Sequence, residues 1–172
     1  MHSLDAPRSV ERGEIDFAVI TTLETKEALT ERVLFTQPFF WVGPKVKGER
    51  RPLTERLRHE PLLRLAAGSQ GRRLLDAFLE EQRIRPVSTI DVPSVSLMLS
   101  YASGGLGIGL APSLARGEVS RSLVVTEHAA VPSLPVKLVY RTNYRPAPAA
   151  EGFVERLLAM SERAARGLSA HR

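Results

Sequence analysis

Short apolar runs alternate with amphipathic helical patterns along most of the chain, and this alternation limits the possible folds more than any other feature. Helices are predicted over residues 74–82, 95–102 and around Phe153, because their apolar residues recur at helical spacing. Short strands are predicted at residues 15–20, 33–35, 39–42, 62–67, 87–92, 106–110, 123–125 and 136–141. This order predicts an α/β fold with a largely parallel sheet.

Composition excludes several classes of protein. The chain has 172 residues, of which 43% are hydrophobic and 25% charged, as in an ordinary globular domain. It has no cysteine, and its four histidines lie far apart, so we expect no metal site and no cofactor. It contains no nucleophile elbow and no recognisable acid/base motif, and Asp16 and Asp91 are interpreted as turn or cap residues. We therefore do not expect an enzyme.

Charge and targeting signals are equally ordinary. The net charge is +5, but the basic residues are spread along the chain, which favours a solvated surface over a nucleic-acid groove. The first fourteen residues contain no apolar core of a secretory signal, and no run approaches the length of a membrane span. The expected location is the cytoplasm.

A glycine-rich run at Gly104-Gly105-Leu106-Gly107-Ile108-Gly109 invites comparison with dinucleotide-binding loops. Those loops follow a strand and precede a helix, so that the helix N-terminus meets the pyrophosphate. Here a helix ends and a strand begins. The run is therefore interpreted as a helix C-cap followed by close backbone packing.

The segment Gly68-Ser69-Gln70-Gly71-Arg72 connects a predicted strand to a helix. The first N–H groups of a helix lack internal partners and carry positive potential, so an anion such as a carboxylate or sulfate can bind there. Ser69 and Gln70 can add side-chain hydrogen bonds, although Ser69 equally suits an ordinary N-cap, and both interpretations stay open. Polar groups also follow two other strands, at Thr21-Thr22 and at Val92-Pro93-Ser94. Together these strand ends predict a cleft for a small polar ligand.

These residues, in this order, resemble the effector-binding region of LysR-type transcriptional regulators. The resemblance rests on the strand motif Gly13-Glu14-Ile15-Asp16-Phe17-Ala18-Val19, on Pro61-Leu62-Leu63, on Gly71-Arg72 with Leu75-Asp76, on the run from Leu97 to Pro112, on Leu138-Val139-Tyr140-Arg141, and on a C-terminal helix around Phe153. Each piece is modestly specific, but the ordered set is quite specific and spans about residues 13–160.

The resemblance implies the two-lobed fold of type 2 periplasmic binding proteins, with a small organic effector bound between the lobes. It implies lobe one at residues 13–30 and 136–165 and lobe two at 44–133. Carried over residue by residue, the expected effector contacts are Thr21, Ser69 and Gln70, with Val92, Pro93 and Ser94 as weaker candidates. The implied partners are the effector, further copies in a homodimer or tetramer, and DNA through a winged helix-turn-helix.

This chain departs from the family pattern at its start. Only twelve residues precede the motif at Gly13, so the winged helix-turn-helix and part of lobe one have no room. The resemblance therefore implies an N-terminally truncated effector-binding domain at residues 13–165, preceded by a non-domain remnant at 1–12 and followed by a tail at 166–172. We expect that this chain alone does not read an operator.

Two other functions are compatible with such a fold. A solute-binding protein for transport is the nearer alternative, but the sequence shows neither a signal peptide nor a lipid-anchor cysteine. An enzyme such as a dehydratase would need an acid/base pair in the cleft, and the sequence indicates none.

Overall fold

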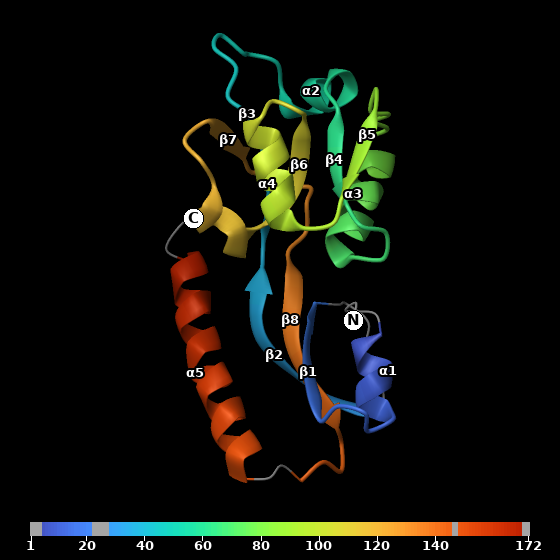
Figure 1. Ribbon diagram of the computed structural model, residues 1–172, viewed down its shortest axis with the longest axis vertical. Helices are drawn as coiled ribbons and strands as arrows, with labels where there is room; N and C mark the ends of the chain where they lie inside the picture. Colours follow the sequence, from blue (N-terminus) through green and yellow to red (C-terminus); the bar gives the residue numbers. More distant parts are fainter. Residues whose placement is uncertain (1–4, 22–27, 146–147, 170–172) are drawn as a thin grey trace. The chain divides into compact units, whose positions relative to one another are not determined.

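Two sheets organise the chain, and each lies in its own compact unit (Figure 1). The structure is a computed structural model that describes residues 5–21, 28–145 and 148–169. Unit one comprises Met1–Gln37 and Ser133–Arg172, and unit two comprises Pro38–Pro132. Both units contain strands and helices, so the predicted α/β class is confirmed.

The sheet of unit one has three strands in the order β1-β8-β2, with β1 at Phe17–Thr21, β2 at Leu29–Gln37 and β8 at Leu134–Arg141. The central strand β8 pairs antiparallel with both neighbours. Because side chains alternate along a strand, Leu138 faces one side of the sheet and Val139 the other, and both are buried. The sheet is therefore covered on both faces.

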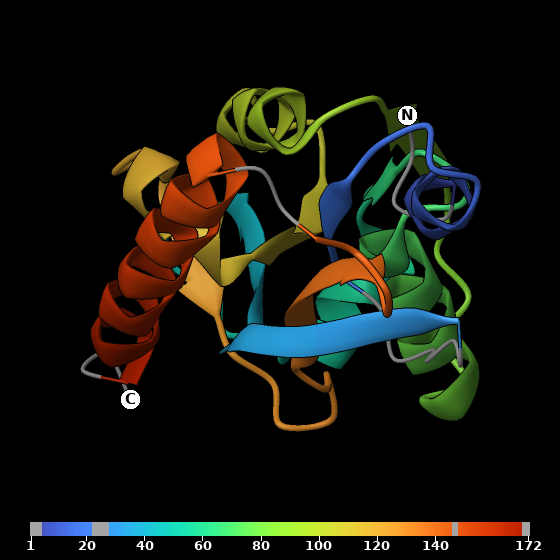
Figure 2. The same ribbon diagram turned by 90° about the horizontal axis from the view of Figure 1, so that it is seen from below.

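Helix α1 (Ala6–Glu11) covers one face of this sheet and α5 (Pro148–Ser169) the other (Figures 1 and 2). On the first face, Ala6 and Val10 pack against Ile20, Leu29 and Val139. On the second face, Val154, Leu157 and Leu158 of α5 pack against Leu34, Val136 and Leu138.

The structure corrects the interpretation of residues 1–12 as a remnant outside the domain. Ala6 and Val10 are buried in the core of unit one, with Val10 fully inaccessible to solvent. The Arg141 guanidinium also donates a hydrogen bond of 2.9 Å to the carbonyl of Val10. Ala6–Glu11 is therefore an integral helix, placed by two apolar residues four positions apart.

The sheet of unit two has five strands in the order β5-β4-β6-β3-β7. The strands are β3 (Phe39–Pro44), β4 (Leu62–Leu65), β5 (Thr89–Val92), β6 (Ile108–Pro112) and β7 (Leu123–Thr126). Only β5, β4 and β6 are mutually parallel, whereas β3 pairs antiparallel with β6 and β7. The predicted largely parallel sheet is therefore wrong, because every other pairing in the two sheets is antiparallel.

Helices cover both faces of this sheet. Helix α4 (Val95–Ser103) packs Met98, Leu99 and Ala102 against the face that carries Phe40 and Val42. Helix α3 (Gln70–Glu81) packs on the opposite face, where Phe78 meets the Trp41 ring at 5.2 Å between centroids. The unit also contains α2 (Leu53–His59) and a 3-10 helix, η1 (Ser113–Glu118). The apolar helix faces predicted for residues 74–82 and 95–102 are confirmed.

The glycine-rich run performs the capping and packing roles expected of it. Helix α4 ends at Ser103 with Gly104 as C-cap, and Gly105 has a φ of 79°. Gly107 has a φ of 152°, and a Cβ there would lie 2.2 Å from the Pro61 carbonyl oxygen. The run therefore joins helix to strand by close backbone contact, and the geometry of a dinucleotide loop is absent from residues 104–109.

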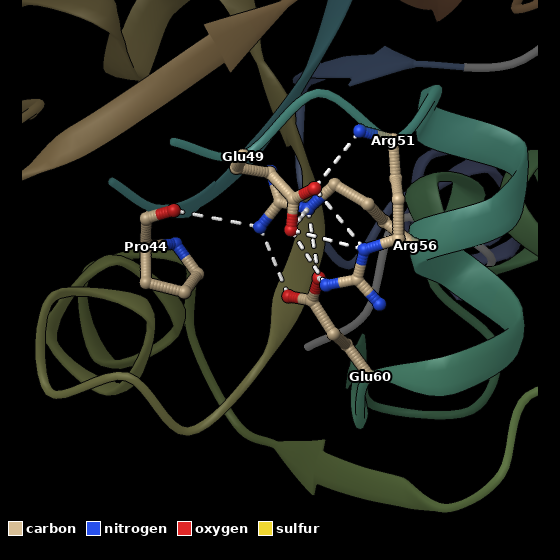
Figure 3. A network of polar contacts seen from close by, with 5 residues as sticks. All are labelled: Pro44, Glu49, Arg51, Arg56 and Glu60. Carbon is tan, nitrogen blue, oxygen red and sulfur yellow. Dashed lines mark hydrogen bonds and ion pairs between the residues drawn. The ribbon is translucent and has the colours of Figure 1, made fainter. Parts of the chain in front are cut away.

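A polar network fixes the loop between β3 and α2 (Figure 3). The buried Arg56 guanidinium donates to both carboxylate oxygens of Glu60, at 2.8 and 2.9 Å, and to the Pro44 carbonyl at 3.4 Å. The Arg51 N–H donates to Glu49 at 2.8 Å. Arg51 hydrogen-bonding lowers the pKa of Glu49 to about 2, so that carboxylate stays charged well into the acid range.

Candidate functional site

The carboxyl ends of β4 and β5 carry the polar groups that the sequence singled out in unit two. Because these strands run parallel, with Leu65 paired to Val92, their ends lie at the same edge of the sheet. Ser69 and Gln70 follow β4 and open α3, whereas Pro93 and Ser94 follow β5 and open α4. The structure thus brings two helix entrances to one sheet edge.

Ser69 is the N-cap of α3. Its Oγ accepts a hydrogen bond of 3.2 Å from the Arg72 N–H, and its carbonyl accepts one of 3.1 Å from the Arg73 N–H. The N–H groups of Gln70 and Gly71, in the first turn, have no acceptor within the helix. The N-cap interpretation is confirmed, yet the Ser69 hydroxyl keeps a proton that it can donate to a ligand.

The second entrance is built in the same way. The Oγ of Ser94 accepts a hydrogen bond of 3.2 Å from the Leu97 N–H. Val92 is buried in the core of the unit, whereas Pro93 and Ser94 are exposed. Val92 therefore anchors the end of β5 in the core, and Pro93 and Ser94 form the exposed surface of this entrance.

A charged cluster beside Ser69 ties the first turn of α3 to the sheet. Arg72 donates from Nε to both oxygens of Asp76 at 2.8 Å, and from Nη1 to Asp91 at 3.2 Å. Asp91 also accepts from Arg64 at 2.9 Å. These ion pairs hold the helix entrance in place, and they were missed because Arg64 and Asp91 are neighbours only through the strand register.

The sequence singled out Asp16 and Asp91 as turn or cap residues, and the structure contradicts this interpretation for Asp91. Asp91 lies within β5, so that interpretation is wrong for it, and the physical reason is its pairing with two arginines across the sheet edge. Asp16 lies just before β1, outside the strand, with an oxygen 3.5 Å from the Arg141 guanidinium.

Thr21 belongs to unit one. It is the last residue of β1, half-buried, and pairs with Val136 of β8. Thr22, its neighbour in the sequence, lies outside the described residues. That Thr21 shares a cleft with Ser69 and Gln70 stays a prediction.

Other kinds of site find no support in the described residues. No group of three or more histidine, aspartate or glutamate side chains among them is arranged to hold a metal ion. Nor does any helix in the described ranges have the length and apolar character needed to cross a bilayer.

Comparison with known proteins places this geometry in context. The family model described as LysR substrate binding domain matches residues 1–162. No curated protein was found that matches the sequence. The regulatory domain of HypT from Salmonella typhimurium, in its apo form, is 26% identical with a TM-score of 0.76, and the match covers 95% of this chain and 80% of that one.

Two further solved structures hold ligands. The regulatory domain of CcmR from Synechocystis PCC6803, in complex with 2-PG, has a TM-score of 0.76 at 15% identity, with 94% of this chain and 80% of that chain covered. The effector binding domain of QuiR, in complex with shikimate, has a TM-score of 0.69 at 17% identity, with 95% and 79% covered. These likenesses confirm the expected two-lobed fold, like that of periplasmic binding proteins.

Proposed function

This chain belongs to the family of LysR substrate binding domains, and from that premise we propose that it is the ligand-sensing regulatory domain of a cytoplasmic LysR-type regulator. The family and its structural neighbours are effector-binding domains of transcriptional regulators. The proposal therefore assigns the chain to binding and signalling, with no catalytic step.

We propose that the effector is a small organic anion, held by Thr21 of unit one and by Ser69 and Gln70 of unit two, with Val92, Pro93 and Ser94 at its rim. The observation that carries this proposal is the capped α3 entrance. There, N–H groups without helical acceptors and a hydroxyl proton are available at a strand end. The neighbour QuiR binds shikimate, which is a carboxylate, and this supports the choice of ligand class.

Signalling follows from binding that involves both units. A ligand shifts a protein between two arrangements only by as much as its affinities for them differ. An effector that contacts residues from both units binds the two arrangements with different affinities, because it makes more contacts in one arrangement than in the other. In this proposal an oligomer of the regulator passes the shift to its DNA-binding helix-turn-helix.

The test exploits two substitutions of Ser69 that differ in charge alone. Asparagine and aspartate are both good N-caps, so Ser69→Asn and Ser69→Asp should each keep the thermal midpoint of the unliganded protein. The added carboxylate of Ser69→Asp repels an anion at the α3 entrance, and should weaken its affinity about tenfold or more. Thermal-shift titration with a panel of small carboxylates, sulfates and phosphates measures both effects.

Gln70→Ala adds a separate probe, since it removes an amide without removing the cap. It should reduce the ligand-induced shift of any anion that Ser69→Asp also rejects. If a stabilising anion acts equally on wild type, Ser69→Asp and Gln70→Ala, the effector does not bind at this entrance.

A further inference from the structure

A cavity of about 560 Å³ lies within unit one, between α5 and the three-stranded sheet. The sheet wall includes Phe17 from β1, Arg32 from β2, and Leu138 and Tyr140 from β8. The helix wall consists of Glu151, Val154, Glu155 and Leu158 of α5. This volume falls within the range of about 300–1,000 Å³ that is usual for small-molecule sites.

The middle of the cavity is apolar and well fixed. Leu138 is 1% exposed, and Val154 and Leu158 pack against the same cluster of buried residues. The Phe17 ring stacks on Phe153 with centroids 5.3 Å apart, which holds its position. A bound ligand would therefore bury its apolar part against side chains that are already held by packing.

Charges of opposite sign stand on the two walls. Arg32 comes from the sheet, and Glu151 and Glu155 come from the helix. All three residues are exposed to solvent, and within the described part of the chain no hydrogen bond or ion pair links Arg32 to either glutamate, although they line the same cavity. The neighbouring Arg141, by contrast, is bound to Asp16 and to the carbonyls of Val10 and Ile15.

Tyr144 also lines the cavity and offers an uncharged phenol group. Tyr144 follows β8, and its ring lies 5.6 Å from the Arg141 guanidinium. Burial, and then the Asp16 carboxylate, raise the pKa of the Tyr144 hydroxyl above its ordinary value, so the group remains protonated at neutral pH. It contributes hydrogen bonding without adding a charge.

We propose that this cavity binds a small zwitterion with an apolar body, either a free apolar amino acid or a short apolar peptide. The carboxylate of the ligand pairs with Arg32, its ammonium pairs with Glu151 or Glu155, and its side chain lies against Leu138, Val154 and Leu158. Such a ligand pairs with the positive and the negative side chains of the cavity. A simple anion can pair with Arg32 but is repelled by the two glutamate carboxylates. Every lining residue belongs to unit one, so the site is separate from Ser69 and Gln70.

The first experiment varies the ligand by isothermal titration of the full chain. The probes are phenylalanine, the dipeptide leucyl-phenylalanine, N-acetylphenylalanine and phenylalaninamide. Each of the last two lacks one charge of phenylalanine and should bind about tenfold more weakly. Tighter binding of the dipeptide than of phenylalanine identifies a peptide site, and the reverse order an amino-acid site.

The second experiment removes the partners on the protein. Arg32→Gln should weaken phenylalanine about tenfold and abolish its advantage over phenylalaninamide. A double variant, Glu151→Gln with Glu155→Gln, should abolish its advantage over N-acetylphenylalanine. Arg156→Gln, on the same helix but outside the cavity lining, is the matched control and should bind as wild type.

Two results with the wild-type protein would overturn the proposal. One is the absence of saturable binding by both phenylalanine and the dipeptide. The other is equal affinity for the charged and the blocked probes in wild type. Binding that is lost in Ser69→Asp would place the ligand in unit two instead and would also reject this site, whereas retained binding separates it from the proposed effector site.

Discussion

Two glycines of unit two, Gly105 and Gly107, have backbone conformations that few other residues can adopt. Gly107 lies immediately before β6, and the first N–H of that strand, that of Ile108, donates to the Pro61 carbonyl at 2.9 Å. That hydrogen bond brings the Pro61 oxygen to the place where a Cβ on Gly107 would stand. Gly105, two residues earlier, has open space around it and only a positive φ.

This contrast predicts different costs for two alanine substitutions. Gly105→Ala should lower the free energy of unfolding by about 1 kcal/mol, the cost of a left-handed alanine. Gly107→Ala adds a backbone clash and should cost about 3 kcal/mol or more. Urea unfolding followed by fluorescence measures both, because Trp41 is the single tryptophan and lies buried in unit two. Equal costs would contradict the role of the Pro61 contact.

Residues that act within one local segment could be predicted from the sequence. Ser69 and Ser94 were recognised as helix entrances because each stands directly before a helical pattern. The pairs of Asp91 with Arg64 and Arg72 could not be predicted, because they depend on how strand β5 aligns with β4. The same limit applies to Arg32 and Glu155, which come to one cavity from distant segments.

At the scale of elements, the loop before α2 is held by charges rather than by apolar burial. Arg56 lies with its side chain only 10% exposed, and Glu60 neutralises it through two hydrogen bonds. Glu49 and Arg51 extend this network to the outside (Figure 3). The loop therefore depends on ionised carboxylates.

Acidification should weaken this part of the fold in a defined window. The pKa of Glu49 is about 2 in the folded protein and near 4.5 in the unfolded chain, so its contribution is fully present above pH 4.5. It is lost as the pH falls towards about 2, because the unfolded state then takes up the proton first.

Comparison with Glu49→Gln isolates this contribution. Wild type should unfold at higher urea than Glu49→Gln at neutral pH, and the difference should shrink below pH 4.5 and vanish near pH 2. Arg51→Gln removes the guanidinium donors to Glu49, which are the main cause of its lowered pKa, and keeps the backbone N–H donor. It should therefore flatten most of the same pH dependence. A difference between wild type and Glu49→Gln that stays constant over this range would contradict the assignment.

The positions of the helices and strands could be predicted from the sequence, but the directions of the strands within the sheets could not. The strands and helices of unit two appear where apolar periodicity indicates them, including α3 and α4. The parallel arrangement was overestimated, because apolar periodicity shows where a strand lies but not which strands it pairs with or in which direction. Helix α1 was missed because six residues with two buried apolar positions give too short a pattern.

At the scale of the whole molecule, unit two is one continuous segment, Pro38–Pro132, with its own buried core. We therefore expect a chain of residues 38–132 to fold alone and to unfold cooperatively in urea. Its Trp41 fluorescence should match that of the full chain, since the Phe78 contact lies within the segment. A non-cooperative transition with solvent-exposed tryptophan emission would show that unit two requires unit one.

The position of β8 has a consequence for how the protein is made. β8 is the strand between β1 and β2, yet it comes last in the sequence of the three. On the ribosome, both earlier strands stay without their partner in this sheet until β8 has been synthesised. Unit two can be complete by then, so the order of synthesis favours an intermediate in which unit two is folded while β1 and β2 still lack their shared partner strand.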